Sequence, residues 1–76
     1  MELLKMMGER LKTLREEEHL TQKDMAELLN CTPSHYQKIE YGKVNISVSM
    51  LALLSDHFHV STDYILGRAE NQDINR

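Results

Sequence analysis

The stretch from Thr21 to Gly42, TQKDMAELLNCTPSHYQKIEYG, decides the fold, because it holds the start signals of two helices and a stop signal between them. Thr21 followed by Asp24 resembles a capping box, with Asp in place of the usual Glu or Gln. This pair predicts a helix over residues 22–29. Asn30 is a natural end for that helix, because asparagine tolerates the left-handed backbone conformation found just past a helix.

A second helix starts almost at once. Thr32 is a good N-cap residue, and Pro33 suits the first helical position, where its missing N–H is no loss. The pattern predicts a helix over 33–41 that is closed by Gly42. Two short helices joined by a tight turn form a helix-turn-helix unit, whose second helix can lie in the major groove of DNA. Taken alone, this spacing is weakly specific, because many small helical bundles contain such a turn.

Helical patterns flank this unit on both sides. Upstream, apolar residues recur at helical spacing and predict a helix over 2–18. Downstream, the N-cap residues Ser47 and Ser61 predict a helix that ends near residue 58 and a short helix over 62–66. Residues 68–76 are polar and aperiodic, which predicts a C-terminal tail. The apolar face of the first helix is expected to consist of Leu3, Met7, Leu11 and Leu14, and that of the fourth of Met50, Leu51, Leu53, Leu54 and Phe58.

Composition agrees with one small helical domain. The chain has 76 residues, of which 41% are hydrophobic and 28% are charged, and its three glycines and one proline argue against a β-rich chain of tight turns. It contains no apolar run of about eighteen residues and no basic N-terminal segment before an apolar one, so neither a membrane span nor a secretory signal is predicted. The single cysteine, Cys31, cannot form an internal disulfide. The sequence therefore predicts an all-α, compact five-helix bundle located in the cytoplasm.

Five short motifs stand in order along the chain: Leu11-x-x-Leu14-Arg15, Leu20-Thr21-Gln22, Ala26-Glu27-Leu28-Leu29, Ile39-Glu40-x-Gly42-Lys43 and Val60-Ser61-Thr62-Asp63-Tyr64-Ile65-Leu66-Gly67. Together they closely resemble the phage repressor/Cro family of helix-turn-helix regulators, also called the Xre-like family. The resemblance covers residues 11–67 and implies a lambda-repressor-like DNA-binding domain there, with the helix-turn-helix motif at about 22–41. Residues 1–10 would be an N-terminal extension of the first helix, and 68–76 would be the polar tail.

The resemblance implies a set of contacts to double-stranded DNA. Gln22 would bond a phosphate and brace the neighbouring helix. Thr32, Ser34 and Lys38 match the base-reading positions of the family, whereas Pro33 stands where some relatives read a base with glutamine. For each of these residues the alternative is an ordinary solvated side chain. The other candidates for DNA contact are Lys23, His35 and Gln37 on the two helices, and Tyr41, Lys43 and Asn45 in the following loop.

Arg15 and Glu40 match a pair that forms a partly buried salt bridge in relatives and ties the first helix to the base-reading helix. A simple phosphate contact by Arg15 is the alternative. With Glu40 neutralised by Arg15, the surface over residues 22–45 becomes mildly positive, although the whole chain carries a formal charge of −3. So weak an electrostatic attraction predicts that one copy binds DNA poorly.

Two copies on a two-fold operator would supply the affinity that one copy lacks. The sequence therefore predicts a homodimer, with Tyr64 and Ile65 in the self-association surface because they are more apolar than the last helix of a monomer requires. The predicted function is that of a bacterial or phage transcriptional regulator, most simply a repressor. The alternative is a protein-interaction module on the same fold, such as an antitoxin or an adaptor, with which the acidic net charge is compatible.

The sequence offers no set of residues suited to catalysis or to holding a cofactor. His57 and His59 are two residues apart, so they point to different faces of a helix and make a poor pair of metal ligands. Cys31 has no neighbouring ligand set and is interpreted as a structural thiol. There is no glycine-rich phosphate loop, acid pair or nucleophile–base arrangement. The sequence predicts a protein that is not an enzyme and takes no metal, cofactor or small-molecule ligand.

Overall fold

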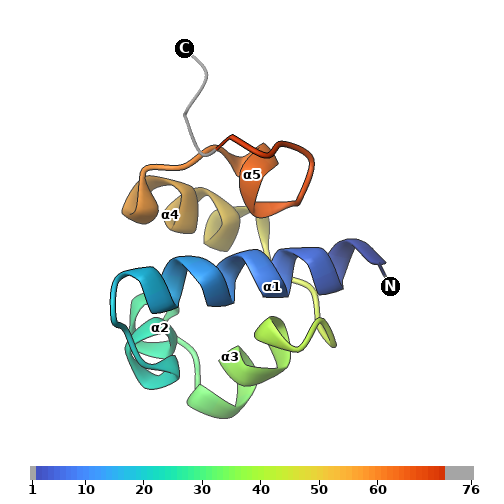
Figure 1. Ribbon diagram of the computed structural model, residues 1–76. Coiled ribbons are helices and arrows are strands. Elements are labelled where there is room, and N and C mark those ends of the chain that lie inside the picture. Colours follow the sequence, from blue (N-terminus) through green and yellow to red (C-terminus); the bar gives the residue numbers. More distant parts are fainter. Residues whose placement is uncertain (1, 72–76) are drawn as a thin grey trace.

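Five α-helices make up the regular secondary structure of residues 2–71, the part of the chain that the computed structural model describes (Figure 1). They are α1 (Glu2–Glu17), α2 (Gln22–Leu29), α3 (Pro33–Glu40), α4 (Val48–Phe58) and α5 (Thr62–Ile65). The predicted all-α fold is confirmed, and each predicted helix is present. Residues 68–71 are not helical, whereas 72–76 of the predicted tail and residue 1 of the predicted extension lie outside the described residues.

Serine and threonine side chains cap the starts of α2 to α5, as the sequence predicts. Thr21 Oγ1 accepts a hydrogen bond from the Asp24 N–H (3.0 Å), and Asp24 Oδ2 accepts one from the Thr21 N–H (2.8 Å), so the capping box is complete. The hydrogen bond from the Thr21 backbone N–H, and after it the interaction with the Thr21 side chain, lowers the pKa of Asp24. Thr32, Ser47 and Ser61 cap their helices in the same way. These local contacts fix where each of the four helices begins. Replacing such an N-cap residue by alanine typically lowers the stability of the protein by about 1 kcal/mol.

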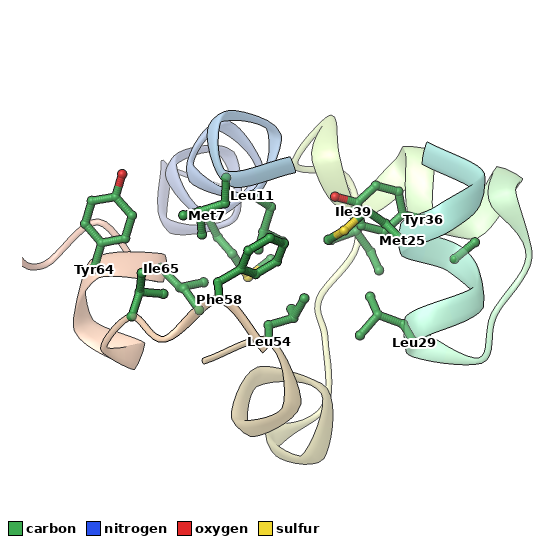
Figure 2. Packing of buried hydrophobic residues seen from close by; sticks show 13 residues of the cluster. Met7, Leu11, Met25, Leu29, Tyr36, Ile39, Leu54, Phe58, Tyr64 and Ile65 are labelled. Carbon is green, nitrogen blue, oxygen red and sulfur yellow. The ribbon is translucent and has the colours of Figure 1, made fainter. Parts of the chain in front are cut away.

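Helix α1 runs through the middle of the molecule, with α2 and α3 on one side and α4 and α5 on the other (Figure 1). Asn30 ends α2 in the predicted left-handed conformation (φ 57°), and the chain turns sharply into α3. Side chains from all five helices meet in one apolar cluster (Figure 2). Burial of this cluster is the main force that holds the helices together. Its buried members are Met7, Leu11, Leu14, Met25, Ala26, Leu29, Tyr36, Ile39, Leu54, Phe58, Val60, Tyr64 and Ile65.

Two glycines let α1 approach the end of α3 closely. A Cβ atom at Gly8 would overlap the carbonyl oxygen of Glu40, and one at Gly42 would lie 2.7 Å from Lys5 Cα. Gly42 also has a φ of +74°, a conformation that side chains disfavour. No role was predicted for Gly8, but this residue and Met7 are buried, so this turn of the predicted extension packs against the rest of the domain.

Two leucines predicted to lie on apolar faces are exposed. Leu3 is in the first turn of α1, where the helix projects past its neighbours (Figure 1). Leu53 precedes the buried Leu54, and one residue of an α-helix corresponds to about 100° of rotation. Leu54 and Phe58, four residues apart, therefore form the buried side of α4 instead.

Tyr64 and Ile65 are buried inside the chain's own core, with 6% and 0% of their surface exposed. The prediction that these two side chains are available as a self-association surface is wrong in this respect. Packing within one copy accounts for their apolar character, because α5 turns them toward the central helix. The guanidinium carbon of Arg10 lies 4.2 Å from the centre of the Tyr64 ring and covers it further. Homodimerisation itself stays a prediction.

Candidate nucleic-acid interface

Helix α3 has two clearly different sides. Tyr36, Ile39 and Glu40 are buried. The side chains on its other side are exposed and of hydrogen-bonding types, and they include five of the residues that the sequence predicts to contact DNA. These five are Thr32, Ser34, His35, Gln37 and Lys38. The structure therefore places Ser34, His35, Gln37 and Lys38 on the exposed part of α3, and Thr32 at its N-cap.

The buried side of α3 ends in a carboxylate that is paired with α1. Arg15 Nε donates to Glu40 Oε2 (2.6 Å) and Arg15 Nη2 donates to Glu40 Oε1 (3.3 Å). Only 13% of the Arg15 side chain and 2% of the Glu40 side chain are exposed. The predicted salt bridge is confirmed. Arg15 Nη1 also donates to the Leu20 carbonyl (2.9 Å), which ties the segment before α2 to the same centre.

Two more donors complete the environment of Glu40. Gln22 Nε2 donates to Glu40 Oε1 (3.2 Å), and the Tyr36 hydroxyl donates to Glu40 Oε2 (2.6 Å). Burial alone would raise the pKa of Glu40, but the hydrogen bonds from Arg15, Tyr36 and Gln22 outweigh it and lower that pKa. Burial, followed by the hydrogen bond to Glu40, raises the pKa of Tyr36, so this phenol stays a donor. The predicted bracing role of Gln22 is confirmed, whereas its phosphate contact stays a prediction.

The loop after α3 carries the remaining predicted contacts. Tyr41, Lys43 and Asn45 are all exposed. The Lys43 N–H donates to the Lys38 carbonyl (3.0 Å), which holds the start of the loop against α3. Asn45 Oδ1 accepts from the Ile46 N–H (2.9 Å), so its amide nitrogen is left for another partner.

The charges on this side of the molecule are modestly positive. Lys23, Lys38 and Lys43 are exposed, and within residues 2–71 none of them is in an ion pair. Asp24 and Glu27 are the exposed carboxylates over residues 22–45, because Glu40 is buried and paired. The small positive excess that the sequence predicts is therefore present at the surface.

A hollow of about 370 Å³ lies beside Gln22, between α1 and the end of α3. Two lysines that were not predicted to belong to the site, Lys5 and Lys12, line it from α1. Their spacing of seven residues places them on one helical face, a signal that was available in the sequence. The other lining residues are Glu9, Arg15, Gln22, Glu40 and Tyr41.

The groups considered as alternatives have other surroundings. His57 Nε2 lies 3.7 Å from Glu18 Oε1, and residues 2–71 contain no cluster of three or more side chains suited to a metal ion. Cys31 is half-buried, and burial raises the pKa of its thiol, which makes it a weaker nucleophile. No helix in the described part of the chain has the length and apolarity needed to cross a membrane.

Known proteins contain the same domain. Residues 11–65 match a family model described as helix-turn-helix (HTH_3). The chain is 41% identical over 61 residues to the SPbeta prophage-derived uncharacterized HTH-type transcriptional regulator YonR of Bacillus subtilis (strain 168), a match that covers 80% of this chain and 56% of YonR. It is 38% identical over 64 residues to the HTH-type transcriptional regulator ImmR of the same organism, covering 84% of this chain and 50% of ImmR. The chain thus spans about half the length of these curated relatives.

A solved structure agrees with this similarity. The crystal structure of the restriction-modification controller protein C.AhdI from Aeromonas hydrophila matches with a TM-score of 0.71 and 26% identity, over 82% of this chain and 94% of that one. The family match includes α2, the turn and α3 together with the helices that support them. The resemblance stated from the sequence is confirmed, and the chain belongs to the helix-turn-helix family of the Xre, or Cro/C1, type.

Proposed function

We propose that the chain is the DNA-binding part of a transcriptional regulator and that α3 is the helix that enters the major groove. The observation that carries this proposal is the two-sided construction of α3. Its buried side is fixed to α1 and α2 through Glu40, while its other side offers exposed polar side chains. A reading helix needs both properties, because base edges are recognised by side chains that are held in a fixed register. The names of YonR and ImmR, both called transcriptional regulators, support the proposal.

The proposed contacts divide into two kinds. Thr32 at the N-cap of α3 and Ser34 and Lys38 on its exposed part, with His35 and Gln37 beside them, would meet base edges. Residues around it would hold the phosphates and set the register of the protein on the duplex. These positioning residues are Gln22, Lys23, Tyr41, Lys43 and Asn45.

Two copies bound to a two-fold operator fit the modest charge of this surface. Affinity that depends on phosphate contacts grows with the number of lysines engaged, and one copy presents few of them. We therefore propose a homodimer on DNA, acting most simply as a repressor. Its contact surface would have to use side chains other than the buried Tyr64 and Ile65.

Selection from random duplex DNA, followed by binding measurements, tests this function. The expected result is an enriched sequence with two-fold symmetry, bound more tightly than a scrambled duplex at low and at moderate salt. Ser34→Ala combined with Gln37→Ala should weaken binding to the enriched sequence about tenfold or more and change binding to scrambled DNA little. Ser49→Ala is the matched control, because Ser49 is also exposed but lies on α4, on the opposite side of α1.

The proposal fails if no sequence is enriched, or if the α3 variant and the α4 control bind all duplexes alike. That result would favour the second candidate function, a protein-interaction module, with which the formal charge of −3 is compatible.

A further inference from the structure

The hydroxyl of Tyr36 is a polar group placed at the edge of an apolar core. The tyrosine is fully buried, and its ring packs in the cluster formed by the five helices (Figure 2). Burying a hydroxyl is unfavourable unless it finds a hydrogen-bond partner, so a phenylalanine would serve the core as well. Here the hydroxyl donates to Glu40 Oε2 at 2.6 Å, a short hydrogen bond to a charged acceptor.

This hydrogen bond completes the set of donors around Glu40. A carboxylate offers about four lone-pair positions. Glu40 receives Nε and Nη2 of Arg15, Nε2 of Gln22 and the hydroxyl of Tyr36. The donors come from α1, α2 and α3, so the carboxylate plane is fixed from three directions and is not free to rotate.

The orientation of Glu40 determines the orientation of Gln22. A glutamine amide has two N–H groups and one oxygen, and one N–H of Gln22 is committed to Glu40 Oε1. The second N–H and the oxygen are left for another partner. Since the amide group is planar, fixing the first N–H also fixes the direction of the second one at the start of α2.

We propose that Tyr36 is a positioning residue for DNA binding, whose hydroxyl locks Glu40 in the orientation that aims the free N–H of Gln22 at a backbone phosphate. The inference rests on the proposed function, because it assigns a DNA contact to Gln22. Tyr36 touches no DNA in this arrangement and acts through Glu40. The position of α2 on the DNA would then depend on a buried side chain of α3.

Tyr36→Phe is the variant of choice, because it keeps the ring in the core and removes the one donor. The dissociation constant for the selected operator should rise about threefold to tenfold, the range expected for losing one hydrogen-bonded contact. The slope of log affinity against log salt should stay unchanged, because neither Tyr36 nor Gln22 carries a charge. Tyr64→Phe is the control for the loss of a hydroxyl from a buried tyrosine outside the helix-turn-helix unit, and thermal melts establish that each variant is folded at the assay temperature.

A double-mutant cycle distinguishes the positioning of Gln22 by Tyr36 from a general loss of rigidity in the domain. In a Gln22→Ala background, Tyr36→Phe should have no further effect on operator affinity, because its route to the DNA is gone. A loss of equal size in both backgrounds would overturn the proposal. So would wild-type affinity of the single variant.

A measurement without DNA keeps the proposal distinct from the proposed function. In the free protein, nuclear magnetic resonance of the Gln22 side-chain amide should show two well-separated proton signals that move toward each other in Tyr36→Phe but not in Tyr64→Phe. Unmoved Gln22 signals would overturn the positioning role even if the protein binds its operator. Moved signals in a protein that binds no DNA would instead contradict the proposed function, and with it the DNA role given to Tyr36.

Discussion

Helix α3 and the pair α4–α5 are attached to the same central helix by different means. α3 is tied to α1 through the buried ion pair of Arg15 and Glu40 and through the close approach at Gly8. α4 and α5 are attached mainly through buried apolar side chains such as Leu54 and Ile65 (Figures 1 and 2). Apolar contacts are non-directional, whereas hydrogen bonds to a carboxylate fix distances and angles.

This difference indicates that the polar contacts and the apolar contacts have different roles in this small domain. A buried ion pair adds little net stability, because desolvation of the two charges offsets most of their attraction. The polar centre around Glu40 is therefore better suited to fixing the orientation of α3 than to keeping the domain folded. The buried apolar side chains, which come from all five helices, supply most of the stability. Each half can be perturbed separately to test this.

The largest expected effect is that of Glu40→Ala, which leaves Arg15 without its partner. Removing one member of a buried pair typically costs about 3–5 kcal/mol, and the partial exposure of Arg15 places this case at the lower end. That is a large part of the stability of so small a domain. Thermal and urea unfolding measure the loss. A variant that melts with the parent would show that the pair contributes nothing measurable to stability.

The double variant Arg15→Met, Glu40→Leu sharpens the same comparison. It replaces both charges by apolar side chains of similar size, so stability should return close to that of the parent. Operator affinity should nevertheless be lower than that of the parent, because Gln22 loses its acceptor. If the double variant recovers both stability and operator affinity, the polar contacts around Glu40 are not needed to orient α3 for DNA binding.

Leu54→Ala tests the other half and should have an effect of comparable size. Leu54 is fully buried, and replacing such a leucine by alanine typically costs about 2–5 kcal/mol. Because the cavity forms on the α4 side, the molecules that remain folded should bind the operator with unchanged affinity. Binding is measured at a temperature where the melt shows the variant to be folded. A fall in intrinsic affinity matching that of the double variant would show that the two halves are coupled.

Acid should weaken the α3 attachment selectively. The pKa of Glu40 lies below its ordinary value of 4.5 in the folded protein, so its stabilising contribution is complete above that pH. The contribution is lost as the pH falls below 4.5 and through the lower folded-state pKa. Wild type should therefore exceed Glu40→Gln in melting temperature at pH 6 by more than at pH 3. The comparison with Glu40→Gln cancels the titration of other carboxylates, including Asp24. An equal margin at both pH values would contradict the prediction.

Signals that are local in the sequence predicted the structure best. Helix starts at Thr21 and Thr32 and the stop at Asn30 depend on hydrogen bonds within a few residues, and all three are confirmed. The Arg15–Glu40 pair joins distant segments, and family resemblance was needed to predict it.

The properties that the sequence could not show depend on how distant segments meet. Gly8 matters only because the Glu40 carbonyl lies against it, and periodicity carries no information about that contact. The hydrogen bond of the Tyr36 hydroxyl was not predicted, because the apolar pattern of the helix already accounted for a buried residue at this position. The spacing of four residues between Tyr36 and Glu40 nevertheless allowed that hydrogen bond. Tyr64 and Ile65 were misplaced because apolar character does not tell whether the covering surface belongs to the same chain or to another.

The smallest expected effects separate two lysines on the α3 side of the molecule. Lys43 follows α3 and should neutralise a phosphate, whereas Lys38 is exposed on α3 and should face base edges. Lys43→Ala should weaken binding to operator and to scrambled DNA alike, and lower the magnitude of the log–log salt slope by about one. Lys38→Ala should cost about 1–3 kcal/mol on the operator and little on scrambled DNA. Arg68→Ala, which removes an exposed charge after α5, is the control.

Equal losses on both duplexes for both lysines would show that Lys38 contacts the DNA backbone, and would leave base reading to Thr32, Ser34 and Gln37. If neither lysine matters, the polar centre at Glu40 orients a surface that does not meet DNA, and the comparison between the two halves of the molecule has to be explained by a protein partner.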